Sequence, residues 1–235
     1  MNTRDFDWKP LALVPALALL VLPFIGSPST WLTLTVAGLA MGMIIFIIAS
    51  GLTLVFGLMD VLNFGHGVFI ALGAFVATSV LGAMGDWTGS EQLWRNMVAV
   101  LPAMLVAMAV AGAVGLAFER FIVRPVYGQH LKQILITMGG MIIGEELIKV
   151  IWGPAQIPLP LPEGMRGSLL VGDAAIEKYR LIAVVVGLVV FGVLAWTLSR
   201  TKVGLLIRAG VQDRELVASL GCRIRRLFVG VCVVV

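Results

Sequence analysis

The chain has 235 residues, of which 60% are hydrophobic and 13% are charged, and its formal net charge is +4. Its mean hydropathy is +1.03. Soluble domains contain about 45–50% apolar and about 25% charged residues, so this composition excludes a soluble globular fold and any nucleic-acid-binding domain built on one. It predicts a single all-α domain over residues 1–235, a polytopic transmembrane helical bundle.

Three spans are predicted in the first part of the chain. A short polar tail precedes an apolar segment at residues 11–25, which we interpret as a retained first span rather than a signal peptide. Further spans are expected at 32–56 and from Gly67 to about Met84. Small residues at helical spacing give the third span a narrow face that another helix could approach closely, formed by Gly67, Ala71, Ala74 and Thr78.

The stretch between the second and third spans, residues 57–66, is polar although apolar sequence surrounds it. Irregular backbone in a bilayer is tolerated only where protein covers it or water lines it, and a charge at that depth marks a pathway or a site. One interpretation is a broken helix pair beside a solute path, while a cytoplasmic turn between two spans explains the same residues equally well. The path candidates are Asp60, Asn63, Gly65, His66 and Gly67.

The rest of the chain predicts spans at 97–118, 134–152 and 181–198, joined by polar segments. In the first of these, Ala107, Ala111 and Gly115, spaced four apart, give a similar small face. The longest loop, 153–179, carries four prolines in its first half. A further apolar run begins at Leu227 and stops at Val235, which is too short to cross a hydrocarbon core of about 30 Å. We therefore expect about six complete spans plus the start of a seventh, in a chain truncated at its C-terminus.

Charged residues also occur inside the span at 134–152. Glu145 and Glu146 would lie about 16 Å from Ile134 along the helix axis. Lys149 follows Glu145 by four residues, the favourable order for an ion pair within a helix. We expect that pair to neutralise itself, and Glu146 remains a candidate for lining a solute path.

The distribution of Lys and Arg predicts the orientation. The tail, the 119–133 connection and the 200–226 segment hold two, three and seven of these residues, twelve in all, whereas the opposite loops hold four. Cytoplasmic loops of membrane proteins carry such an excess. The N-terminus is therefore expected inside, with the 57–66 stretch toward the inner side.

The last inward segment, residues 200–223, predicts two short helical pieces that meet at residues 210–212. Asp213 can cap the second piece, Glu215 lies in its first turns, and Gly221 can end it. A short amphipathic helix of this kind can dock into the groove of a soluble partner or lie on anionic lipid.

Three separated motifs resemble the permease subunits of branched-chain amino-acid ABC importers of the LivH type. The resemblance covers nearly all of the chain after the first span. Its motifs are Gly57, Asn63-Phe64-Gly65, Gly67 and Leu72-Gly73-Ala74-Phe75, then Glu119-Arg120, Arg124-Pro125 and Ile136-Thr137-Met138-Gly139, and finally Gly204, Arg208-Ala209, Asp213 and Leu220-Gly221.

This resemblance implies a permease of the bacterial inner membrane without chemistry or cofactor of its own, because partner subunits bind and hydrolyse ATP. The implied partners are a related or identical second permease, two cytoplasmic ATPases and an extracytoplasmic solute-binding protein. The family also contains urea and short-amide permeases, so the substrate stays open. The resemblance assigns ATPase coupling within 200–223 to Gly204, Arg208, Ala209, Asp213, Glu215 and Gly221.

A stand-alone secondary transporter or channel is the rival hypothesis. Secondary transporters are expected to show inverted repeats around a midplane site, and no clear repeat is seen within the 235 residues. A membrane-bound enzyme would need a catalytic pair on facing spans, and the two histidines, His66 and His130, are poorly placed for one. No arrangement of metal-ligand spacing is evident.

Overall fold

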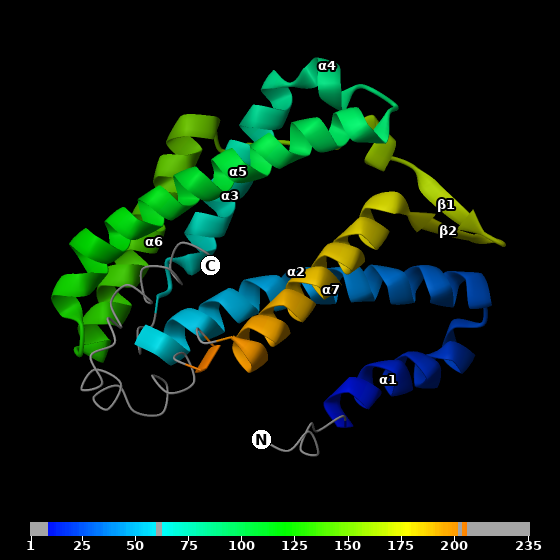
Figure 1. Ribbon diagram of the computed structural model, residues 1–235, viewed down its shortest axis with the longest axis horizontal. Coiled ribbons are helices and arrows are strands. Elements are labelled where there is room, and N and C mark those ends of the chain that lie inside the picture. The colour runs from blue at the N-terminus through cyan, green and yellow to red at the C-terminus, as the bar shows by residue number, and fades with distance from the viewer. Residues whose placement is uncertain (1–8, 60–62, 202–203, 206–235) are drawn as a thin grey trace. The chain divides into compact units, whose positions relative to one another are not determined.

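The computed structural model describes residues 9–59, 63–201 and 204–205, and its contacts divide the chain into two compact units. The first unit comprises residues 1–46 and 166–189, and the second comprises residues 47–165 and 190–235. Two long helices, α2 (Pro28–Met59) and α7 (Lys178–Arg200), contribute to both units. Figure 1 shows the helices and the single hairpin of the described chain.

The first unit is held together by contacts of α2. Its neighbour α1 (Lys9–Ile25) is joined to it by a turn at Gly26, which has φ +70°. The Trp31 indole N–H donates to the carbonyl of Ala18 over 2.7 Å and fixes α2 to α1. A methyl group on Gly187 would overlap the Met43 side chain, so the absence of a Cβ lets α7 approach α2 closely here.

A β-hairpin occupies part of the segment that the sequence predicted as a polar loop. Strands β1 (Ser168–Val171) and β2 (Ala174–Glu177) pair antiparallel, with Leu169 opposite Ile176. The two residues between the strands are Gly172, with φ +61°, and Asp173, and a Gly-Asp pair is typical of a two-residue hairpin turn. The loop prediction was wrong here because it gave weight to the prolines and overlooked this turn.

The second unit contains three packed helices and their connections. They are α3 (His66–Ala83), α5 (Leu93–Phe118) and α6 (His130–Trp152), with the short α4 (Gly85–Thr88) between α3 and α5. After α5 the chain makes a π-helical turn, η1 (Glu119–Val123), and a 3-10 turn, η2 (Arg124–Val126). A second 3-10 turn, η3 (Glu163–Met165), contacts α5.

Small residues form the interface between α3 and α5. Ala99, Ala103 and Ala107 are buried, and Leu81 packs against the first two. A methyl group on Gly73 would stand 3.8 Å from the Cβ of Ala111. The small face predicted on α5 therefore packs as expected at Ala107 and Ala111.

The small face predicted on α3 has a different outcome. A methyl group on Gly67 would meet no described atom within 4 Å, and Ala74 is exposed. Helices α5 and α6 pack against other sides of α3, at Gly73 and at Val68 respectively. No described helix packs closely on this narrow face, and its role as a packing face stays a prediction.

Four described helical segments are long and apolar enough to cross a membrane: Pro28–Gly57, His66–Ala83, Trp94–Val126 and Lys178–Arg200. The chain is thus an all-α helical membrane protein with one small hairpin. Helix α1 has 17 residues, which is short for a crossing, and α6 carries Lys132, Glu145, Glu146 and Lys149. These two features explain why six complete spans are not seen, and the seventh lies outside the described residues.

Candidate functional site

The polar stretch predicted between the second and third spans separates α2, which ends at Met59, from α3, which begins at His66. The Asn63 side chain organises its described part, because its Oδ1 accepts the backbone N–H of Gly65 over 3.0 Å. The backbone N–H of His66 donates to the Asn63 carbonyl over 3.3 Å, and that of Val68 to Gly65 over 3.0 Å. Asn63 thus satisfies a backbone donor and directs the chain into α3.

This turn lies part-way along the neighbouring helices. The His66 imidazole lies near the backbone of Ile48, which precedes the end of α2 by eleven residues, about 16 Å of helix. Figure 1 likewise shows α3 beginning short of the end where α5 and α6 are connected. Helix α2 therefore continues past the level at which α3 begins.

The Phe118 ring joins the turn to α6. A methyl group on Gly65 would stand 3.5 Å from its Cζ, and one on Gly140 would overlap the ring. The ring also makes an edge contact with Phe69, with centroids 5.3 Å apart and planes at 73°. Phe118 is therefore partly buried, with close neighbours in the turn, in α3 and in α6.

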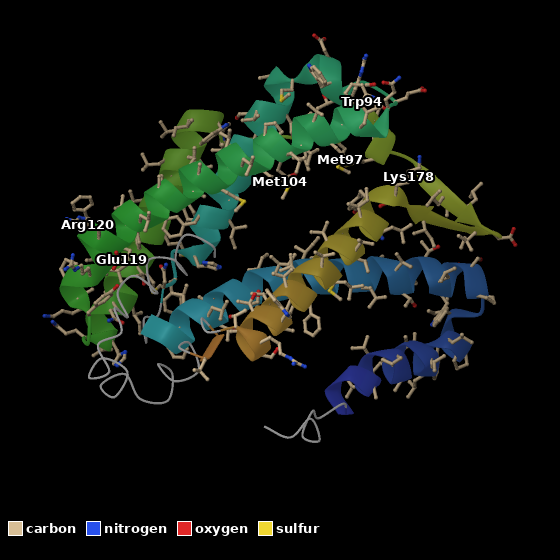
Figure 2. The ribbon with its side chains drawn as sticks, viewed as in Figure 1. Trp94, Met97, Met104, Glu119, Arg120 and Lys178 are labelled. Atoms are coloured by element: carbon tan, nitrogen blue, oxygen red, sulfur yellow. The ribbon has the colours of Figure 1, made fainter. Side chains whose placement is uncertain are left out.

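The connection that follows Phe118 is tied down by polar contacts. The Tyr127 hydroxyl donates to Glu119 Oε1 over 2.6 Å, and the Gln133 side-chain amide donates to the Val126 carbonyl over 3.1 Å. Figure 2 shows Glu119 and Arg120 at the opposite end of α5 from Trp94. π-Helical turns are rare and frequently occur at functional sites, and η1 begins directly after Phe118.

One face of α6 carries the residues that pack on the site. Gln133 and Thr137 are fully buried. The absence of a side chain leaves room for the Phe118 ring at Gly140 and for Val68 at Gly144. These four residues lie at i, i+4, i+7 and i+11, so they share one side of the helix. This face was not predicted from the sequence, although its residues are spaced like those of the small faces predicted on α3 and α5.

Glu146 does not join this arrangement. Its Oε1 lies 2.6 Å from Lys149 Nζ, and its side chain is 63% exposed. Glu146 follows Gly144 by two residues and is therefore on the other side of α6. The expected pairing of Lys149 with Glu145 was wrong, because the three-residue spacing brings Glu146 to Lys149 in this helix.

Several predicted site residues lie outside the described residues: Asp60 of the path set, and Arg208, Ala209, Asp213, Glu215 and Gly221 of the coupling set. Gly204 is described and buried, and its N–H donates to Thr201 Oγ1 over 3.2 Å. A methyl group on Gly204 would overlap the backbone of Leu198, so Gly204 lies directly against the last turns of α7. Within the described ranges no three His, Cys, Asp or Glu side chains come together as a metal site.

Residues 34–235 match the family model described as branched-chain amino acid transport system / permease component. The chain belongs to this permease family. The turn at Asn63, the Phe118 contacts and the start of the 200–223 segment all fall within the matched residues.

Individual members of the permease family show the same relationship. The chain is 31% identical over 198 residues to the permease protein BraD of the high-affinity branched-chain amino acid transport system of Pseudomonas aeruginosa, covering 79% of this chain and 61% of BraD. It is 26% identical over 196 residues to LivH of the same system in Escherichia coli, covering 81% of this chain and 62% of LivH. The aligned part thus spans about three fifths of each relative, and no solved structure gives a significant match.

Proposed function

We propose that this chain is a transmembrane permease subunit of an ABC importer for branched-chain amino acids, situated in the bacterial inner membrane. The match of residues 34–235 to the permease family is the observation that carries the proposal. Both relatives described above are named as permeases of branched-chain amino acid transport, which favours these substrates over urea and short amides. The four apolar helices provide the membrane-spanning part.

The broken helix between α2 and α3 forms part of the solute path in this proposal. In this proposal α6 also lies in the membrane: it has 23 residues and is about 34 Å long, enough to cross a hydrocarbon core of about 30 Å, although its four charged residues leave it outside the four apolar segments. The turn reaches it through Phe118 at Gly140, ten residues or about 15 Å from its start. That level supports a re-entrant break at membrane depth rather than a turn at the surface.

The described side chains between α2 and α3 suit a polar lining. Asn63 and His66 are partly buried and supply amide and imidazole groups, while Gly65 and Gly67 let other groups approach the backbone. Irregular backbone at this depth has to line water or be covered by protein. Asp60 belongs to the same proposed path, whereas Glu146, on the far side of α6, is a weaker candidate.

In this proposal the cytoplasmic segment 200–223 couples the permease to ATP hydrolysis by its partner ATPases. Two ATPases bind Arg208, Ala209, Asp213 and Glu215, and their closure on ATP rocks the attached helices against a second permease subunit. An extracytoplasmic binding protein delivers the solute. The cytoplasmic N-terminus rests on the excess of Lys and Arg in the tail, in 119–133 and in 200–226.

Uptake by reconstituted vesicles tests the proposal. The permease, its partner permease, both ATPases and the binding protein are reconstituted, and entry of labelled leucine is followed with urea and acetamide as competitors. We expect uptake that requires ATP and is reduced by isoleucine or valine but not by the amides. Uptake that continues without ATP, or with ATPases that cannot hydrolyse it, would show a stand-alone transporter or channel. Competition by urea or acetamide would instead assign the short-amide substrates.

Co-purification tests the coupling segment. Asp213→Lys should reduce the ATPases recovered with the permease while leaving its insertion unchanged, because it reverses a charge at the proposed docking helix. Asp173→Lys makes the same change at the hairpin turn and should have no effect. Full recovery of the ATPases with Asp213→Lys would contradict this role.

A further inference from the structure

We infer that Phe118 is a positioning residue of the transport cycle, which transmits movement of the α5–α6 connection to the Asn63–Gly65 turn. The inference rests on the proposed function and adds a residue outside the predicted path and coupling sets. Phe118 lies at the end of α5, where the α-helix changes into the π-helical turn η1.

The ring has close neighbours on three different segments. Gly140 has no side chain, and the ring fills the space that a methyl group would need. Gly65 faces the ring edge from the turn, with Cζ 3.5 Å from a Cβ placed there, and Phe69 contacts it from α3. Side chains in close contact transmit displacement from one segment to the next. A shift of the Phe118 ring toward any of these neighbours therefore moves that neighbour.

The other side of Phe118 is attached to a connection that resists local deformation. The Glu119–Tyr127 hydrogen bond spans η1 and η2, and Val123 within η1 is buried. The Gln133 amide ties Val126 to the first turn of α6. A displacement of this connection is therefore carried to α5 and its terminal ring rather than absorbed by a slack loop.

Substitutions at Phe118 and at Phe121 separate this role from general packing. Phe121 follows by three residues and is 72% exposed, so Phe121→Ala removes the same ring from an open position. In the reconstituted complex we expect Phe118→Ala to lower leucine uptake per ATP hydrolysed by roughly 10-fold, within the range that single substitutions produce on coupling. Phe121→Ala should leave this ratio within about 2-fold of the unmodified complex.

A size-exchange experiment keeps the inference testable if Phe118→Ala does not insert. Gly140→Ala should lower the ratio of uptake to hydrolysis because its methyl group displaces the ring, whereas Gly139→Ala should not, since no described atom lies within 4 Å of a methyl group there. Adding Phe118→Leu to Gly140→Ala should recover most of the ratio of uptake to hydrolysis, because the smaller leucine side chain leaves room for the added methyl group.

The outcomes distinguish the two proposals. A normal ratio in Phe118→Ala, or uptake and hydrolysis that fall in equal proportion, would overturn the role of Phe118. Failure of the size exchange to recover the ratio would do the same. Absence of ATP-dependent uptake in the unmodified complex would instead overturn the proposed function itself.

Discussion

Helix α3 packs against its two neighbours in different ways. Toward α5 the interface is smooth over most of its length, where buried alanines meet Gly73 and Leu81, and large side chains meet at its end in the Phe69–Phe118 edge contact. Toward α6 it is interlocked: Val68 fills the space above Gly144, and Trp152 contacts the Phe75 ring and donates to Ser79 Oγ over 2.8 Å. Small residues allow two helices to approach and to slide, whereas a side chain seated over a glycine fixes their register.

This contrast suggests which helices of the second unit move together and which can shift. The α3–α6 pair is fixed by apolar and polar contacts along its length, so α3 and α6 should move together. The α3–α5 pair lacks such contacts among its buried alanines and can adjust, and Phe118 at the end of α5 then meets both partners. Rocking of a permease requires some interfaces to hold and others to slide.

The largest effect is expected from closing the space at Gly144. A methyl group there would stand 2.5 Å from Val68 Cγ1, so Gly144→Ala should lower the free energy of unfolding by about 1–3 kcal/mol through overpacking. Gly139→Ala, on an open side of the same helix, is the matched control. Unfolding in mixed detergent micelles measures both, and Val68→Ala combined with Gly144→Ala should restore much of the loss. Equal stability of Gly144→Ala and Gly139→Ala would contradict the interlocked packing.

Asn96, near the start of α5 and beside η3, tests whether α5 has a hidden polar contact next to its buried alanines. Its side chain is 0% exposed beside Ala99 and Gly164, and neither amide atom has a partner in the described residues. Leaving buried polar atoms unpaired costs free energy, so Asn96→Leu, which keeps the branching, should raise stability by about 1–2 kcal/mol. Asn96→Asp keeps the shape but buries a charge and should strongly destabilise. A fall in the thermal midpoint of Asn96→Leu would mean that the amide has a partner after all.

Much of the helical fold could be predicted from the sequence because hydrophobic runs and helix length are local properties. The predicted spans at 97–118 and 134–152 became Leu93–Phe118 and His130–Trp152, each begun one turn earlier by polar residues that helices tolerate at their ends. The π-helical turn after Phe118 was not predicted, because it depends on packing around Val123 rather than on local composition.

The candidate site was predicted in part. The break and its polar residues Asn63 and His66 were identified from glycine and polar positions inside an apolar region, which is a sequence pattern. Phe118 and Gly140 were missed because the contact between an aromatic ring and a distant glycine has no signature in a single sequence. The level of the turn relative to α6 likewise follows from tertiary contacts.

A smaller effect is expected at Ala107, on the smooth interface. Ala107→Gly removes one methyl group from a face that already packs small residues, so the loss should stay near the intrinsic helix penalty of about 1 kcal/mol. Ala113→Gly, at an exposed position of α5, carries the same intrinsic penalty and serves as the control. Unfolding of both variants under identical conditions gives the comparison. A loss at Ala107 well above that at Ala113 would show that the α3–α5 interface is fixed by close packing as well.

The smallest effect on isolated subunit stability is expected at the Glu146–Lys149 pair. Both side chains are largely exposed, at 63% and 50%, and lie on the side of α6 away from Gly140 and Gly144. Exposed ion pairs contribute little, so Lys149→Gln should leave the thermal midpoint of the purified subunit unchanged. The same substitution in the assembled importer sharpens the contrast, because charged groups within membrane-crossing helices usually face protein or water. Loss of assembly with unchanged subunit stability would show that a partner covers this side of α6, whereas no change in either measurement would show that assembly does not depend on the Glu146–Lys149 pair.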